Sequence, residues 1–186
     1  MARILIPLAQ GCEELEAVTI IDLLRRAGCE VLTATLDQSE IVASRGTRLL
    51  ADTHLDKIES NDFDMIVLPG GQPGTNKLNA DPRIHRLLAE FSEADKFVTA
   101  ICAAPKVLSD AGILDNRQAT SFPGALDGTK GKNIKYKEES VVIDGKIVTS
   151  RGPGTAMDFA LTLVELLKGP AVRQQVEGPL QRPAPG

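Results

Sequence analysis

The sequence predicts an α/β protein in which a doubly wound parallel sheet carries helices on both faces. Short, apolar and often β-branched segments of strand length recur along the chain. Segments with the apolar spacing of amphipathic helices separate them. Several of the strand segments end in loops that contain glycine. This alternation is typical of a parallel sheet, whose binding sites gather at the carboxyl ends of the strands near a topological switch point.

The first part of the chain begins this alternation. We expect a strand, a helix, a second strand and a small hairpin, at residues 4–6, 15–26, 30–34, and 41–42 with 47–50. Gly28 follows the last apolar residues of the helix and is expected to end it. The hairpin lies outside the βα alternation and is joined through Ser44 to Gly46.

The second part continues the pattern. Asp81 and Pro82 are expected to begin a helix that buries Ile84, Leu87, Leu88 and Phe91. We further expect strands at residues 65–68 and 97–101, a helix after the second of these, a hairpin at 141–149 around Asp144-Gly145, and a helix at 155–168 that ends at Gly169-Pro170. Residues 1–180 are interpreted as one domain and residues 181–186 as a loose C-terminal tail.

Composition excludes several classes of function. The 186 residues include 42% hydrophobic and 25% charged residues, as in an ordinary globular protein. A net charge of −4 and a pI near 5.3 argue against nucleic acid or an anionic membrane as an electrostatic partner. No segment has the length of a membrane span, and the N-terminal apolar run is short for a signal peptide. The three cysteines lack metal-ligand spacing, so we expect no metal and a reducing, cytoplasmic location.

Cys102 is the best candidate for chemistry in the chain. It follows the apolar strand at 97–101 and precedes Ala103, Ala104 and Pro105, which suit the start of a helix. At a sharp strand-to-helix bend the side chain projects outward, as the nucleophile does in an elbow motif. The N–H groups and the dipole of the helix would lower the thiol pKa. A buried structural cysteine fits the same local pattern equally well.

Two other loops are expected to reach the same edge of the sheet. Glu13, Glu14 and Glu16 follow the first strand, and Gly70 and Gly71 follow the strand at 65–68. Glu13 and Glu14 are interpreted as ordinary helix N-terminal charges. A protonated Glu16 would donate a hydrogen bond to a thiolate, whereas an ionised one would repel it. The backbone N–H groups of Gly70, Gly71 and Ala103 could hold an oxyanion, although a plain tight turn explains the glycines as well.

Four ordered motifs resemble one known family. They are Gly11-Cys12-Glu13-Glu14-Leu15-Glu16, Leu68-Pro69-Gly70-Gly71, Ala100-Ile101-Cys102-Ala103-Ala104-Pro105 and Thr149-Ser150-Arg151-Gly152-Pro153-Gly154-Thr155. Over nearly the whole chain they resemble the ThiJ/PfpI superfamily, most closely its Parkinson-disease-protein (DJ-one) branch, which includes the bacterial YajL type.

The resemblance implies a flavodoxin-like fold, a homodimer and a cysteine nucleophile at Cys102 with Glu16 as its carboxylic-acid partner. It also implies backbone donors at Gly71 and Ala103. Residues that match the lining of the family's pocket are Arg45, Gly152 and Pro153.

The chain departs from some members of this family at one position. Those members have a histidine near the cysteine in a Thr-His-Pro context, whereas this chain has Phe122 in the run 120–123. A phenylalanine cannot relay protons. The two histidines, His54 and His85, precede Cys102 and are interpreted as a loop residue and a solvated helix residue. A Cys-His triad is therefore not expected.

These observations lead to two functional hypotheses from different classes. The first is a cofactor-free enzyme of glyoxalase or protein-deglycase type, as the resemblance implies, in which the Cys102 thiolate attacks a small carbonyl compound or the carbonyl adduct of a glycated protein. The second is a redox sensor or stress-response chaperone in which Cys102 is oxidised without turnover. Both hypotheses use the same site.

Overall fold

The computed structural model describes residues 1–37 and 40–182, and its centre is a seven-stranded sheet. The strand order is β10-β11-β7-β6-β1-β2-β5, and every neighbouring pair is parallel except β10 with β11. The strands are β1 (Arg3–Leu8), β2 (Glu30–Thr35), β5 (Thr53–His54), β6 (Met65–Leu68), β7 (Phe97–Ile101), β10 (Val141–Asp144) and β11 (Ile147–Ser150). The expected flavodoxin-like α/β sheet is confirmed, with one antiparallel edge strand.

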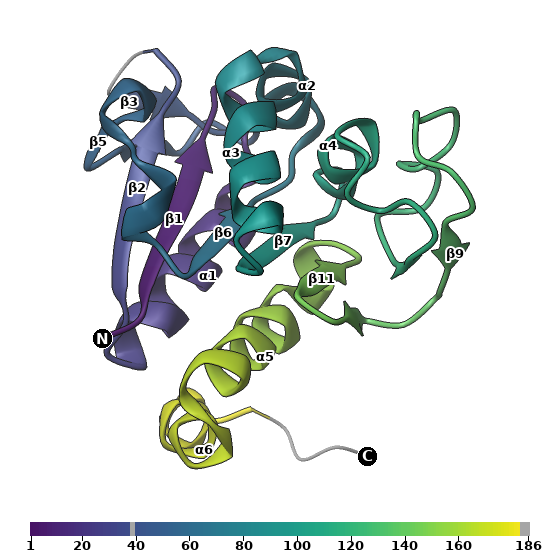
Figure 1. Ribbon diagram of the computed structural model, residues 1–186. Helices are drawn as coiled ribbons and strands as arrows, with labels where there is room; N and C mark the ends of the chain where they lie inside the picture. The colour runs from purple at the N-terminus through teal and green to yellow at the C-terminus, as the bar shows by residue number, and fades with distance from the viewer. Residues whose placement is uncertain (38–39, 183–186) are drawn as a thin grey trace.

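Helices cover both faces of this sheet (Figure 1). They are α1 (Glu14–Arg26), α2 (Gln72–Ala80), α3 (Pro82–Glu93), α4 (Pro105–Asp110), α5 (Ala156–Lys168) and α6 (Pro170–Glu177). Short 3₁₀ turns occupy Leu55–Lys57, Ser60–Asp62, Pro153–Thr155 and Gly178–Leu180. Helix α1 packs on α5, and α5 packs on α6. No described helix has both the length and the apolar character needed to cross a membrane.

The core is divided between the two faces of the sheet because successive strand residues point in opposite directions. Ile4, Ile6 and Val67 belong to the cluster that contains α1 and α5. Leu5 and Ile66 belong to the other, which contains α3 and α4. Central strands buried on both faces read as continuous apolar runs, which is why the sequence identifies β1 and β6 so clearly.

Two small sheets lie outside the main one. Strands β3 (Glu40–Val42) and β4 (Arg48–Leu50) form the expected antiparallel hairpin. Strands β8 (Gln118–Ala119) and β9 (Lys135–Tyr136) pair in parallel, and the sequence pattern does not indicate them. Ser44 N–H donates to the Cys12 carbonyl at 2.8 Å, so the β3–β4 hairpin is attached to the loop that precedes α1.

Sequence reasoning missed two helices. The first, α2, begins immediately after Gly71. Its Pro, Gly and Asn residues have low helix propensity, and packing of Gly74 against the Cys12 backbone offsets this, since an added Cβ would lie 2.8 Å from Cys12 Cα. The second, α6, buries only Val176 among its residues and therefore shows little apolar periodicity.

The C-terminal segment is only partly a loose tail. Arg182 forms ion pairs with Glu177, at 2.8 Å, and with Asp158 on α5. These contacts attach the chain end to α5 and α6 as far as Arg182. The rest of the expected tail, residues 183–186, lies outside the described residues.

Candidate functional site

The candidate site lies where three neighbouring strands end at the same edge of the sheet. In the strand order, β1 lies between β2 and β6, and β7 follows β6. The chain leaves β1 towards β2 and later returns on the other side of β1 to form β6, so this is the topological switch point. Glu16 follows β1, Gly70 and Gly71 follow β6, and Cys102 follows β7. The three predicted loops therefore meet as expected.

Cys102 has a strained backbone conformation. Its φ of 64° is left-handed, which costs a residue with a Cβ about 1–3 kcal/mol. Such a conformation persists only where the surrounding structure holds it. Its N–H donates to the Ser150 carbonyl at 2.9 Å, and its carbonyl accepts from the Phe122 N–H at 2.8 Å. Backbone bonds from two directions thus hold the bend. The residue is 9% exposed, so it is almost completely enclosed.

Backbone N–H groups surround the sulfur. The N–H groups of Gly71 and Ala103 act as hydrogen-bond donors to Cys102 and lower its pKa. Glycine is required after β6 because the chain packs closely there. A Cβ on Gly70 would lie 2.6 Å from Cys102 Cβ, and a Cβ on Gly71 would lie 2.5 Å from the Glu13 backbone nitrogen. The Gly71 φ of 88° also favours glycine.

Glu16 is a buried carboxyl that faces this thiol. The residue lies in the first turn of α1 and has no exposed surface. Its Oε2 accepts a hydrogen bond of 2.8 Å from the Gly70 N–H, and its carboxyl is also a hydrogen-bonding partner of Cys102. The second oxygen, Oε1, is buried without a hydrogen-bond partner among the described residues. The Glu16 carboxyl is therefore held next to the thiol, and one of its oxygens can still form a hydrogen bond.

The two groups titrate as a pair. Burial, which outweighs the hydrogen bond from Gly70, raises the pKa of Glu16 to about 7. Burial and the nearby Glu16 carboxylate raise the pKa of Cys102 to about 12. The sequence-based prediction of a lowered thiol pKa relied on the helix N-terminus and on a protonated Glu16. That terminus is weaker than expected, because α4 is six residues long and begins at Pro105, whereas burial and an ionised Glu16 act in the opposite direction. Protonation of Glu16 therefore favours the thiolate, while burial of the sulfur still opposes it.

The remaining predicted residues fall into two groups. Gly152 adjoins the thiol, since a Cβ built on it would lie 4.0 Å from Cys102 Sγ and 3.6 Å from Phe122 Cδ2. Phe122 is 51% exposed, and Pro153 follows Gly152 in a 3₁₀ turn. Arg45, in contrast, is an exposed residue of the β3–β4 hairpin, and its N–H donates to Glu14 Oε1 at 3.0 Å.

Glu13 and Glu14 are more than helix N-terminal charges. Ser44 Oγ donates to Glu13 Oε2 at 2.7 Å and to Glu14 Oε2 at 3.0 Å. Glu14 also accepts from the N–H groups of Arg45 and Thr47. Although its limited burial opposes ionisation, these bonds and that of its own N–H lower the pKa of Glu14 to about 2. The two carboxylates attach the β3–β4 hairpin to the start of α1, a role that sequence reasoning missed.

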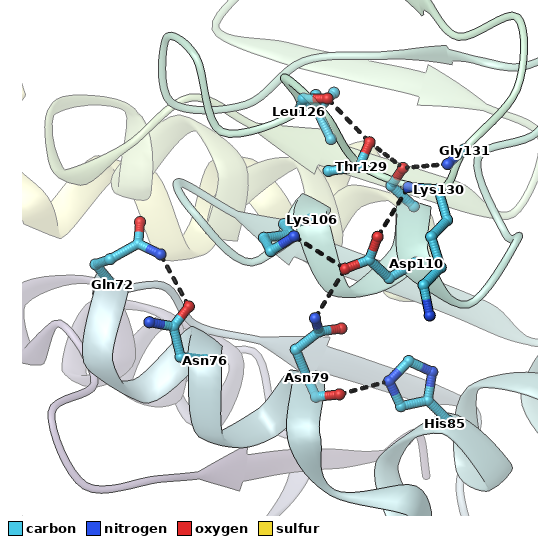
Figure 2. A network of polar contacts seen from close by, with 11 residues as sticks. Gln72, Asn76, Asn79, His85, Lys106, Asp110, Leu126, Thr129, Lys130 and Gly131 are labelled. Carbon is cyan, nitrogen blue, oxygen red and sulfur yellow. Dashed lines mark hydrogen bonds and ion pairs between the residues drawn. The ribbon is translucent and has the colours of Figure 1, made fainter.

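A polar network centred on Asp110 also escaped prediction (Figure 2). Its carboxylate accepts from Asn79 Nδ2 at 2.8 Å, from Lys106 Nζ at 3.0 Å and from the Lys130 N–H at 2.9 Å. Asn79 is on α2, which begins after Gly71, and Lys106 is on α4, which begins after the Cys102 elbow. Asp110 therefore joins the two helices that begin at the site, and its only sequence signal is the i, i+4 spacing to Lys106.

The histidines are placed away from this chemistry. His85 Nε2 lies 2.8 Å from the Asn79 carbonyl oxygen, and His54 ends β5 at the far edge of the sheet from β7. In the part of the chain that the structure describes, no group of three or more His, Cys, Asp or Glu residues is arranged to hold a metal ion. Cys12 and Cys29 are buried, and burial is the largest cause of the raised pKa of each thiol.

A flavodoxin-like sheet with a left-handed cysteine at its switch-point edge defines a recognisable class of α/β protein. Residues 2–166 match the DJ-1/PfpI family, and the chain belongs to that family. It is 43% identical over 169 residues to Protein DJ-1 homolog B of Arabidopsis thaliana, covering 90% of this chain but 38% of that protein. The chain thus spans well under half the length of this relative.

Two further comparisons cover nearly the whole of both chains. The glutathione-independent glyoxalase DJR-1.2 of Caenorhabditis elegans is 37% identical over 179 residues, 96% of this chain and 95% of that protein. The crystal structure of Drosophila melanogaster DJ-1beta superposes with a TM-score of 0.92 at 37% identity, over 98% of this chain and 99% of that one. The resemblance noted from the sequence motifs is therefore confirmed.

Proposed function

We propose that this protein is a cofactor-free thiol enzyme that acts on reactive carbonyl compounds. The observation that carries the proposal is the arrangement around Cys102, with N–H donors from Gly71 and Ala103 and a buried Glu16 carboxyl as its partner. Nucleophile, oxyanion donors and proton carrier are the three parts that a carbonyl addition needs. The name of the C. elegans relative as a glutathione-independent glyoxalase supports the same reaction class.

The scheme for methylglyoxal has three stages. The Cys102 thiolate attacks the aldehyde carbon, and the Gly71 and Ala103 N–H groups stabilise the charged oxygen of the adduct until the Glu16 carboxylic acid protonates it to a hemithioacetal. The Glu16 carboxylate then takes the proton from that carbon and delivers it to the neighbouring carbonyl carbon, while the hydroxyl proton passes to the neighbouring oxygen, which leaves a thioester and a hydroxyl. Water cleaves the thioester to lactate and restores the thiol. One water is consumed, and the oxidation of one carbon balances the reduction of the next.

Glu16 is the carrier because it can hold its proton near neutral pH. Burial raises its pKa to about 7, and an ionised form would leave the buried Oε1 without a donor among the described residues. A proton on the carboxyl removes the repulsion that raises the thiol pKa and supplies a donor to the sulfur. Phe122 occupies the position where some relatives have a histidine, so Glu16 works without a second proton carrier.

The direct test measures lactate formed from methylglyoxal. Cys102→Ser is expected to abolish turnover, while Cys29→Ser, at a buried thiol that precedes β2, retains it. Glu16→Gln keeps a hydrogen-bond donor but has no transferable proton, so turnover should fall by about 10² or more. Turnover that survives in Cys102→Ser would reject the proposal.

Thiolate absorbance against pH tests the state of Glu16. If the protonated carboxyl donates to sulfur, Glu16→Leu removes the donor and raises the thiol pKa, whereas Glu16→Gln changes it little. If Glu16 is ionised when the thiol titrates, Glu16→Leu removes a repulsion and lowers the thiol pKa instead. A lowered pKa in Glu16→Leu would therefore reject Glu16 as the donor.

A second candidate function uses the same sulfur as an oxidation sensor. The backbone donors around Cys102 favour this function, because the Gly71 and Ala103 N–H groups would stabilise the negative oxygens of a sulfinate. The distinguishing measurement is the mass of the Cys102 peptide after treatment with limited hydrogen peroxide. Quantitative sulfinate formation without lactate production would favour the sensor over the enzyme.

A further inference from the structure

Asp110 carries a carboxylate that the proposed mechanism does not use. It is the last residue of α4, and its side chain is only 8% exposed. Its Oδ2 accepts from Asn79 Nδ2 at 2.8 Å and from Lys106 Nζ at 3.0 Å, and its Oδ1 accepts from the Lys130 N–H at 2.9 Å. Figure 2 shows the three donors converging on this one carboxylate. They come from α2, from α4 and from the segment between β8 and β9.

Each of these three segments also reaches the thiol. Helix α2 begins after Gly71 and α4 begins two residues after Ala103, and the N–H groups of both residues donate to Cys102. Phe122 lies in the same segment as Lys130, and its N–H donates to the Cys102 carbonyl at 2.8 Å. The Asp110 carboxylate therefore connects the three segments whose backbone N–H groups surround the cysteine.

The hydrogen bond between Asp110 and Asn79 joins the ends of α2 and α4 that point away from the site. Both helices begin at the thiol, and they pack on each other. Since α4 has only six residues and α2 contains proline and glycine, neither helix keeps its direction by its own stability. Fixing the far ends of the helices therefore fixes the separation of the Gly71 and Ala103 N–H groups at their near ends.

We propose that Asp110 is a positioning residue for Cys102, whose hydrogen bond with Asn79 holds α2 and α4 at the separation that directs the Gly71 and Ala103 N–H groups at the sulfur. This inference rests on the proposed function, in which those two groups stabilise the thiolate and the charged oxygen of the adduct. It gives a role in the chemistry to a carboxylate at the opposite end of α4 from the thiol.

Alkylation of Cys102 by iodoacetamide tests this role without requiring turnover. The sulfur attacks the methylene carbon, a C–S bond forms, the C–I bond breaks and iodide leaves. The readout is the second-order rate constant at a fixed pH of about 8, below the thiol pKa, followed by mass spectrometry of the Cys102 peptide. The rate depends on the fraction of thiolate, which the N–H donors increase.

Asp110→Ala should slow this alkylation about threefold or more, because misaligned donors raise the thiol pKa. A rise of about one unit lowers the thiolate fraction about tenfold, and the greater nucleophilicity of a more basic thiolate recovers about threefold. A mere loss of stability would open the site and speed alkylation. Loss of a negative charge near the thiol would favour the thiolate and also speed it. A slower reaction therefore separates positioning from both alternatives.

Two further variants test the hydrogen bond itself. Asn79→Ala removes it from the α2 side and should slow alkylation to a similar degree. The double variant Asp110→Ala/Asn79→Ala should be about as slow as Asp110→Ala, because the same contact is lost in both. Asp110→Asn keeps an acceptor oxygen for Asn79 and should react faster than Asp110→Ala.

The matched control is Ser109→Ala. Ser109 precedes Asp110 on α4 and is fully buried, but its Oγ donates to Thr129 Oγ1 at 2.7 Å and accepts from the Gly131 N–H at 3.1 Å. Its removal weakens the same segment between β8 and β9 and leaves the contact of Asp110 with Asn79 in place. The rate for Ser109→Ala should equal or exceed that of the wild type. Circular dichroism establishes that each variant is folded before rates are compared.

An Asp110→Ala rate equal to or above that of the wild type, or an equal slowing in Ser109→Ala, would overturn the positioning role. A wild type that forms no lactate would overturn the enzyme proposal but leave these rate constants unaffected. The two failures are therefore distinguishable.

Discussion

At the scale of single residues, Glu16 combines a charged residue type with complete burial. Its pKa is raised by burial to about 7 from the ordinary 4.5, so the folded protein holds a proton on this carboxyl that the unfolded chain has lost. Stability from this source is fully present below the unfolded pKa. It decreases as pH rises through the folded pKa, because folding must then bury a charge or bind a proton.

Glu16→Gln should remove this pH dependence. We expect the free energy of unfolding of the wild type to fall by about 3 kcal/mol at most between pH 4.5 and 7, and that of Glu16→Gln to stay nearly level over this part of the profile. Urea unfolding at a series of pH values measures both. The same slope in wild type and variant would show that Glu16 is not the group with the raised pKa.

The left-handed backbone of Cys102 allows a second test at this scale. Glycine has no Cβ to strain, so Cys102→Gly should be more stable than Cys102→Ala by about 1 kcal/mol. Cys29 serves as the control, because it is also buried but is not in the left-handed region, and there the alanine variant should be the more stable. Thermal unfolding of the four variants gives the comparison. A Cys102→Gly variant less stable than Cys102→Ala would contradict the strain argument.

At the scale of elements, the site depends on two helices that are weak by themselves. Helix α4 has six residues, and α2 contains proline, glycine and asparagine. The Asp110 carboxylate, with a side chain only 8% exposed, joins them and also fixes Lys130. Removal of a buried acceptor leaves its donors unpaired, which costs about 1–3 kcal/mol.

Asp110→Ala should therefore lower the free energy of unfolding by about 2 kcal/mol or more. Asp110→Asn keeps an acceptor oxygen and should lose less. Glu93→Ala, at an exposed position of α3, is the control and should have little effect. Chemical denaturation measures all three, and an Asp110→Ala protein as stable as Glu93→Ala would contradict a structural role for the network.

The elements that the sequence predicts are those with strong periodicity. Strands β1 and β6 are buried on both faces, and α3 has its four buried apolar residues in the expected positions. Helix α2 was missed because contacts with the Cys12 loop override its low helix propensity. Strands β8 and β9 are two residues each, too short to show alternation.

The candidate site, too, was predicted only in the part that depends on the order of the strands. Gly70, Gly71 and Cys102 were found because strand ends meet at one edge of a parallel sheet. The sequence could not show that Arg45 lies on the exposed hairpin, that Glu14 anchors this hairpin, or that burial opposes thiol ionisation. These properties depend on contacts between residues far apart in the chain.

At the scale of the whole molecule, α1 exposes large apolar side chains. Leu15 is 50% exposed and Val18 is 47% exposed, and Leu50 on the β3–β4 hairpin is 76% exposed. We propose that this surface forms the two-fold interface of a homodimer, as the sequence resemblance implies. An isologous contact through α1 would bring each partner close to the Glu16 end of the other's helix.

Leu15→Glu tests this interface. Sedimentation of the wild type at micromolar concentration should give about 40 kDa, twice the 19.9 kDa chain, whereas the variant should sediment as a monomer. Ile143→Glu changes a side chain of similar exposure, 48%, on edge strand β10 and should leave the dimer intact. A wild type that sediments as a monomer would exclude the dimer.

The two edge strands of the sheet, β5 and β10, affect how easily the protein aggregates. On one side the sheet ends at β5, which has only two residues, and on the other at the four-residue β10. The end of β10 is partly occupied, because Asp144 accepts from the Gln118 N–H at 2.8 Å and pairs with Arg117 at 3.3 Å. Open edges invite strands from other molecules, and short or occupied edges discourage them. Cys102 follows β7, which is an inner strand, so covalent damage to it would leave both edges poor templates for fibril growth.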